Sequence, residues 1–150
     1  MRFLTFLLFA IFLPSAFPAQ VDLFTAKDLQ GVAAALTPKE AGFADKNLAR
    51  YGNHYFLLAK REQTGSSEMH EHEADVFVVQ SGEAAIVLGG KIVGSHAVKP
   101  GELRGTSIEG GERRHLAAGD VIHIPAGTPH QLLLTKGKPF VYFVVKVTGQ

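Results

Sequence analysis

From His54 onward the chain is a series of short apolar runs separated by glycine and proline, and this pattern constrains the fold more than any other feature. Short runs with frequent turn signals indicate an antiparallel sandwich or barrel. We therefore predict an all-β fold, an antiparallel β-barrel or jelly roll, preceded by a short helix. The expected strands are 54–61, 75–80, 84–88, 121–124, 131–134 and 140–147, with weaker candidates at 92–93 and 96–98.

Upstream of these runs, residues 21–36 are expected to form the helix. Thr25 can cap its start, with Asp28 at the spacing of a capping box, and Thr37-Pro38 can end it. We expect residues 37–53 to be a loop with a second short helical turn. The polar, glycine-rich stretch 99–114 is expected to be the longest loop, and a long loop beside a cavity can act as a lid.

The first nineteen residues resemble a targeting segment. Arg2 is followed by an apolar run over residues 3–13, which is too short to cross a bilayer but suits a signal peptide. Cleavage after Ala19 would leave Phe17 where a small residue is usual, so the cleavage position stays open, and an uncleaved anchor or a buried strand are alternatives. We divide the chain into a signal peptide (1–19), a helix with a first strand (20–64) and a barrel (65–150). The mature protein is expected to be secreted or periplasmic, with no stable membrane anchor after processing.

Composition excludes several classes of function. The chain has no Cys, which excludes disulfide scaffolds, Cys-ligated zinc, iron–sulfur clusters and thiol catalysis. Its formal net charge is +1, so there is no large basic field for nucleic acid, and we expect no nucleic-acid partner.

Histidines supply the candidate metal ligands. His70 and His72 are two residues apart, and on a strand such residues project from the same face. Asp75 follows, and His130 begins a later strand after a Pro/Gly turn. Three imidazoles and a carboxylate suit a divalent transition metal (Mn, Fe, Ni, Cu or Zn) and not Ca or Mg. The alternative is that His70 and His72 lie on the surface of a metal-free barrel.

At these positions residues 65–134 resemble the cupin family. The first motif of that family is a Gly, His-x-His, a Glu and a further Gly, and the matching residues here are Gly65, His70, His72, Asp75 and Gly82. The second motif is matched by Gly119, Pro125, Gly127 and His130. The resemblance implies a cupin barrel with His70, His72, Asp75 and His130 as metal ligands.

The chain departs from the family pattern in its spacing. Only two residues separate His72 from Asp75, where three or four are usual, and four separate Gly65 from His70, where five are usual. Strict alternation would place Asp75 on the face opposite His72, so a bend or bulge must intervene. Leu134 stands where the family has Asn.

The resemblance also implies a function. A metal in such a barrel binds an oxygen-bearing molecule and acts as a Lewis acid or as a redox centre. We hypothesise an exported metal-binding cupin that acts on a small oxygenated molecule by oxidation, isomerisation or lysis. A non-catalytic small-ligand-binding cupin is the alternative, because the sequence identifies no second acid or base beside the ligands. Pairing through edge strands would give a homodimer. Arg104 and His123 could each lie on the surface or face the cavity.

Overall fold

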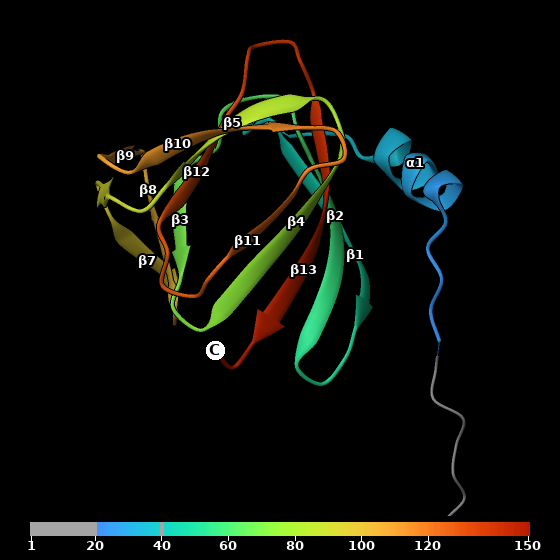
Figure 1. The fold of residues 1–150 in the computed structure, drawn as a ribbon, viewed down its shortest axis with the longest axis horizontal. Helices are drawn as coiled ribbons and strands as arrows, with labels where there is room; N and C mark the ends of the chain where they lie inside the picture. The colour runs from blue at the N-terminus through green and yellow to red at the C-terminus, as the bar shows by residue number, and fades with distance from the viewer. Residues whose placement is uncertain (1–20, 40) are drawn as a thin grey trace, which may run out of the picture.

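Two antiparallel sheets lie face to face and curve into a barrel in this computed structural model, which describes residues 21–39 and 41–150 (Figure 1). The predicted signal peptide, 1–19, lies outside the described residues. The predicted all-β antiparallel barrel with one short N-terminal helix is confirmed.

The first sheet has the strand order β1-β2-β13-β4-β11. Its strands are β1 (Phe43–Arg50), β2 (His54–Arg61), β13 (Phe140–Thr148), β4 (Glu73–Ser81) and β11 (Val121–Ile124). The second sheet has the order β10-β5-β12-β3-β8-β7. Its strands are β10 (Glu112–Ala117), β5 (Glu83–Leu88), β12 (His130–Leu133), β3 (Ser67–His70), β8 (Glu102–Gly105) and β7 (His96–Lys99). A separate two-stranded antiparallel sheet pairs β6 (Lys91–Val93) with β9 (Ser107–Glu109).

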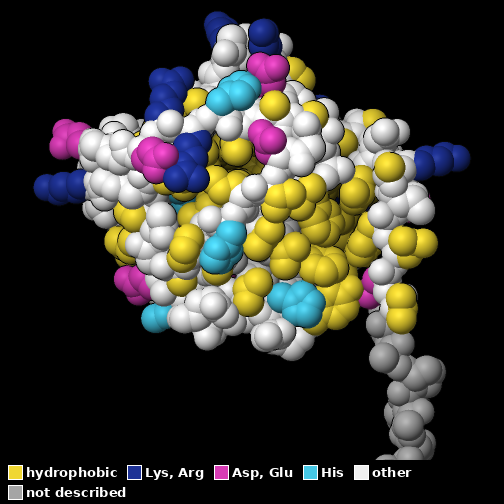
Figure 2. Space-filling model, in the orientation of Figure 1, with side chains coloured by type: hydrophobic (Ala, Val, Ile, Leu, Met, Phe, Trp, Pro, Cys, Tyr) yellow, Lys and Arg dark blue, Asp and Glu magenta, His cyan; other side chains and the backbone are white. Residues whose placement is uncertain are grey.

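An apolar core fills much of the space between the two sheets. Phe140 and Ile86 are completely buried there, and Val144 and Ile124 are almost as inaccessible. These residues come from alternate positions of their strands, as expected when one face of each strand points inward. The opposite face of the first sheet carries half-buried aromatic side chains, including Phe56 and Phe143, whose rings are 5.3 Å apart. Hydrophobic side chains accordingly gather on the surface over β2 and β13 (Figure 2).

The helix α1 (Ala26–Ala35) begins as the sequence predicts. The backbone N–H of Asp28 donates to the Thr25 side chain at 3.2 Å, and the backbone N–H of Thr25 donates to the Asp28 carboxylate at 3.0 Å. This reciprocal capping box satisfies two N–H groups that a helix start leaves unpaired. The helix lies beside the barrel and buries none of its residues (Figure 1). No helix among the described residues has the length and apolar character needed to cross a membrane.

Two stretches expected to be loops are strands instead. Residues 37–53 contain β1, which pairs with β2 along its length and has an irregular register between Asn47 and Ala49. Its mixed composition follows from its position at the sheet edge, where several side chains face solvent. Residues 43–61 thus belong to the same sheet as β13 and β4.

The stretch 99–114 contains β8, β9 and the start of β10. Glycines make the turns between these short strands: Gly111 has a φ of 85°, and an added Cβ there would lie 2.7 Å from the Leu88 carbonyl oxygen. The strands are too short to show periodicity in a glycine-rich sequence, which is why the stretch resembled one long loop.

Candidate metal centre

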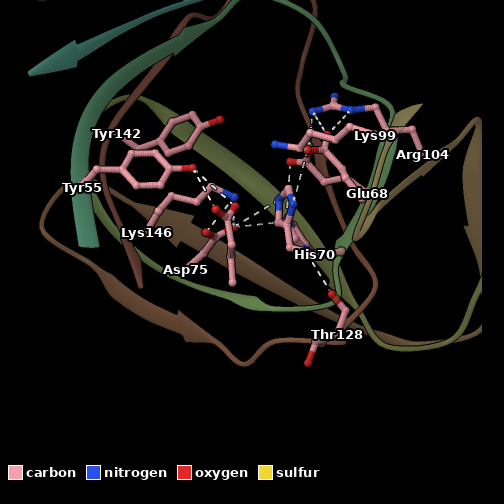
Figure 3. Close-up of polar contacts among 12 residues, drawn as sticks. Tyr55, Glu68, His70, Asp75, Lys99, Arg104, Thr128, Tyr142 and Lys146 are labelled. Atoms are coloured by element: carbon pink, nitrogen blue, oxygen red, sulfur yellow. Dashed lines mark hydrogen bonds and ion pairs between the residues drawn. The ribbon is translucent and has the colours of Figure 1, made fainter. Parts of the chain in front are cut away.

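Four side chains from three strands converge inside the barrel. Glu68 and His70 are two apart on β3, so both project from its inner face. His130 is the first residue of the neighbouring strand β12, where it pairs with Glu68. Asp75 lies on β4 in the opposite sheet and points toward His70 (Figure 3). His70, His130 and Asp75 are each at most 5% exposed.

The potential ligand atoms face one another at distances too long for good hydrogen bonds. His130 Nε2 lies 3.5 Å from Glu68 Oε1 and 3.6 Å from Asp75 Oδ2, and His70 Nε2 lies 3.7 Å from the same Asp75 oxygen. One ligand atom from each of Glu68, His70 and His130 lies within 4.8 Å of the others. Neither Nε2 atom has a hydrogen-bond partner among the described residues, although both are buried. Buried polar atoms are normally paired, so this geometry fits a group held between the four side chains.

Hydrogen bonding prepares His130 for the role of a ligand. Its Nδ1 lies 3.0 Å from the Thr128 carbonyl oxygen, to which only a protonated Nδ1 can donate. The neutral ring then has its lone pair on Nε2, the atom that faces Glu68 and Asp75. Such an orienting contact on the other ring nitrogen is the usual companion of a metal-ligating histidine.

The electrostatic surroundings differ between the two imidazoles. Burial and the positive charge of Lys146 lower the pKa of His70 to about 4, which keeps its ring neutral and able to bind a metal. Burial also tends to lower the pKa of His130, but the interaction with the Glu68 carboxylate outweighs burial, and the pKa of His130 is raised. Burial opposes ionisation of Glu68 as well, yet contacts with His130 and Arg104 lower its pKa. Burial raises the pKa of Asp75. The Glu68 carboxylate and the His130 ring therefore each favour the charged form of the other.

Basic side chains neutralise the carboxylates from outside the cluster. Lys146 Nζ lies 2.8 Å from Asp75 Oδ1, and Arg104 Nη2 lies 3.0 Å from Glu68 Oε2. Arg104 also contacts Glu102 at 2.7 Å. These groups line a cavity of about 210 Å³ inside the barrel. Arg104 thus faces the cavity, whereas His123 is exposed on β11.

The structure does not bring His72 to this group, so the expected convergence of three imidazoles is not found. Its side chain is 75% exposed, and its ion-pair partner is the neighbouring Glu71 at 3.9 Å. The reason is that β3 ends at His70 and the chain bends before β4 begins at Glu73. The alternation that would have placed His72 beside His70 is therefore interrupted.

Glu68 is the residue that sequence reasoning missed, and the spacing anomaly was its signal. If the paired positions of the first motif are Glu68 and His70, four residues separate His70 from Asp75, which lies within the usual three or four. This shift of two residues brings the second interval to the usual length and places a carboxylate where the family pattern has its first histidine, but it leaves only two residues between Gly65 and Glu68, where five are usual.

The comparisons with known proteins agree with this architecture. The family model described as Cupin domain matches residues 104–146. No curated protein sequence matched the chain. The chain is therefore similar to the cupin family over residues 104–146, and its fold resembles that of solved structures with a double-stranded β-helix.

Three solved structures illustrate the likeness. An uncharacterised conserved protein with a double-stranded β-helix domain from Klebsiella pneumoniae has a TM-score of 0.58 and 18% identity. The superposition covers 87% of this chain and 93% of the Klebsiella chain. KdgF from Halomonas sp. has a TM-score of 0.55 and 17% identity, covering 77% of this chain and 88% of its own. A recombinant oxalate oxidase in complex with glycolate has a TM-score of 0.52 and 15% identity, covering 73% of this chain and 53% of its own. At these identities the likeness establishes the shared fold.

Proposed function

We propose that this chain is a metal-binding cupin whose Glu68, His70 and His130, with Asp75, hold one divalent transition metal beside a cavity for a small oxygenated molecule. The observation that carries the proposal is the pair of buried imidazole Nε2 atoms that lack hydrogen-bond partners and face two carboxylates. Leaving a buried polar group unpaired costs about 1–3 kcal/mol. Glu68 and Asp75 each have a basic ion-pair partner, Arg104 and Lys146, whereas the two imidazole Nε2 atoms face only these carboxylates.

The donor set narrows the choice of metal. Two imidazoles with one carboxylate and open positions are the ligands of non-haem Fe(II) centres, and additional carboxylate ligation also suits Mn(II). When bound, such a metal supplies a Lewis acid or a redox centre for dioxygen chemistry. The residues of this chain orient it: Thr128 fixes the tautomer of His130, and Arg104 holds the Glu68 carboxylate.

Metal analysis tests the proposal directly. Elemental analysis of purified protein, after incubation with Mn(II) or Fe(II) and removal of excess ion, should give about one metal per chain. His70→Ala and His130→Ala should each lose most of it. His72→Ala is the matched control, because it removes an imidazole two residues from His70 that lies outside the group. Wild-type protein without metal, or equal loss in His72→Ala and His130→Ala, would contradict the proposal.

Turnover distinguishes a catalytic cupin from a ligand-binding one. The metal-loaded protein would be tested by oxygen uptake and product analysis with phenols, keto acids and sugars. Conversion of one of these compounds that disappears in His130→Ala supports a catalytic cupin: oxygen uptake identifies oxidation, and product analysis identifies isomerisation or lysis. Ligand binding without turnover supports the non-catalytic alternative.

We propose in addition that residues 1–19 direct export of the protein. The support is the apolar run after Arg2, followed by small residues and prolines. N-terminal sequencing of protein recovered after expression of the full chain would test it. A chain that retains Met1 in the cytoplasmic fraction would contradict it.

A further inference from the structure

Lys146 is a largely buried basic residue that is not one of the proposed metal ligands. The register of the first sheet places Tyr55 on β2, Lys146 on β13 and Asp75 on β4 in one row across three adjacent strands. All three side chains line the cavity, and the Lys146 side chain is only 12% exposed. Burying an ammonium group is costly unless it is paired, and here Asp75 provides the partner.

The ammonium group retains hydrogen-bonding capacity beyond that pair. Lys146 Nζ lies 2.8 Å from Asp75 Oδ1 and 3.0 Å from Oδ2. An ammonium group carries three N–H donors, of which one donates to Asp75 Oδ2, while Oδ1 lies at ion-pair distance. Lys146 reaches the centre of the group in Figure 3, on the opposite side of His70 from Glu68 and Arg104.

Arg104, another of the basic side chains that line the cavity, has more of its N–H donors occupied. Its Nε and Nη2 contact Glu102, Nη2 also contacts Glu68, and Nη1 donates to the Ser66 hydroxyl at 3.3 Å. Arg104 therefore stabilises the acidic side chains of the site, whereas Lys146 has a donor to offer to a molecule in the cavity.

The charges around the cavity indicate the kind of molecule. Five acidic and four basic side chains line it, which leaves one excess negative charge. A divalent metal would turn this into one excess positive charge, and a single anionic group would neutralise it. The cavity volume of about 210 Å³ is below the about 300–1,000 Å³ of pockets for drug-sized ligands, so the anion must be small.

We infer that the ligand of this cavity is a small carboxylate and that Lys146 is the residue that binds its negative charge. This inference rests on the proposed function, because the metal supplies the charge that makes the cavity favour an anion. Lys146 contributes specificity, and Glu68, His70 and His130 contribute metal affinity.

Glycolate and its neutral isostere glycolamide provide the test. Isothermal titration calorimetry on Mn(II)-loaded wild-type protein should show glycolate binding about tenfold or more tightly than glycolamide, as expected for a hydrogen bond to a charged group. Lys146→Gln, which keeps a donor for Asp75 but removes the charge, should abolish this preference while retaining Mn(II). Lys60→Gln is the control, because Lys60 lies on the outer face of β2, paired with Glu62.

The outcomes separate the two proposals. Equal affinity of wild-type protein for glycolate and glycolamide would overturn the carboxylate inference without any variant being needed. Unchanged glycolate affinity in Lys146→Gln would overturn the role of Lys146. Metal without glycolate binding overturns only this inference, whereas wild-type protein that takes up no metal overturns the proposed function as well.

Discussion

The barrel interior has two regions of opposite character that are built from the same strands. On β13, Phe140 and Val144 are buried in the apolar core, whereas Lys146, two residues further on, is buried against Asp75. On β4, Phe77 and Val79 belong to the core, and Asp75 belongs to the polar cavity. The apolar region gains free energy from removing surface from water, while the polar region must pair every charge it buries. Stability should therefore depend on the first region and ligand binding on the second.

Removing an aromatic ring from the core should have the largest effect on stability. Phe140 is 0% exposed, so Phe140→Ala should lower the free energy of unfolding by about 3–5 kcal/mol. Denaturant unfolding followed by circular dichroism measures this loss. Val121→Ala, at a side chain that is 64% exposed, should change stability by about 0.5 kcal/mol or less. Loss of metal by folded Phe140→Ala protein would show that the two regions are not separable.

Saturating the polar region with metal should produce the next largest effect. A ligand that binds only the folded state at about 100 times its Kd adds about 2.7 kcal/mol to the free energy of unfolding. Wild-type protein with Mn(II) should gain this stability in thermal unfolding, and a chelator should reverse it. His130→Ala should gain none, and equal stabilisation of His130→Ala would locate the bound metal elsewhere.

Neutralising Glu68 should weaken metal binding more than folding. Glu68→Gln keeps the side-chain size but removes a charged ligand, and we expect about a tenfold to hundredfold loss of Mn(II) affinity, which corresponds to about 1.4–2.7 kcal/mol. Calorimetric titration with Mn(II) measures it. Glu71→Gln is the matched control on the exposed bend after His70. Similar affinity losses in both variants would mean that general negative charge, and not coordination by Glu68, attracts the metal.

The smallest effect is expected outside both regions. Thr25→Ala removes the cap of α1 and should destabilise the helix by about 1 kcal/mol. Because α1 buries no residue, the change should appear as faster amide exchange within the helix, with Mn(II) affinity unchanged. Thr37→Ala, beyond the other end of the helix, removes no N-cap and should leave exchange as it is.

The sequence predicted the parts of the fold whose signals are local. The capping box of Thr25 and Asp28 lies within four residues, and β2, β4 and β13 each contain a short apolar run. The edge strand β1 was missed because its polar side chains reflect exposure at the sheet edge, which only the assembled sheet defines.

The same distinction applies to the candidate site. Residues 70, 75 and 130 were selected from motif spacing, and the structure brings these three together. His72 was selected by assuming that β3 continues past His70, and no local signal marks the bend there. In the sequence Glu68 appears only as one of the residues between Gly65 and His70. Its place in the site depends on strand pairing with His130, which is 62 positions further along the chain.

The position of β13 has a consequence for how the protein is made. β13 is the last strand in chain order, yet it lies between β2 and β4 and pairs with both. A nascent chain still lacking residues 140–148 would leave the edges of two apolar strands open, and such edges are prone to aggregation. The first sheet can close only when synthesis reaches β13, so the facing edges of β2 and β4 stay unpaired while the preceding residues are being made.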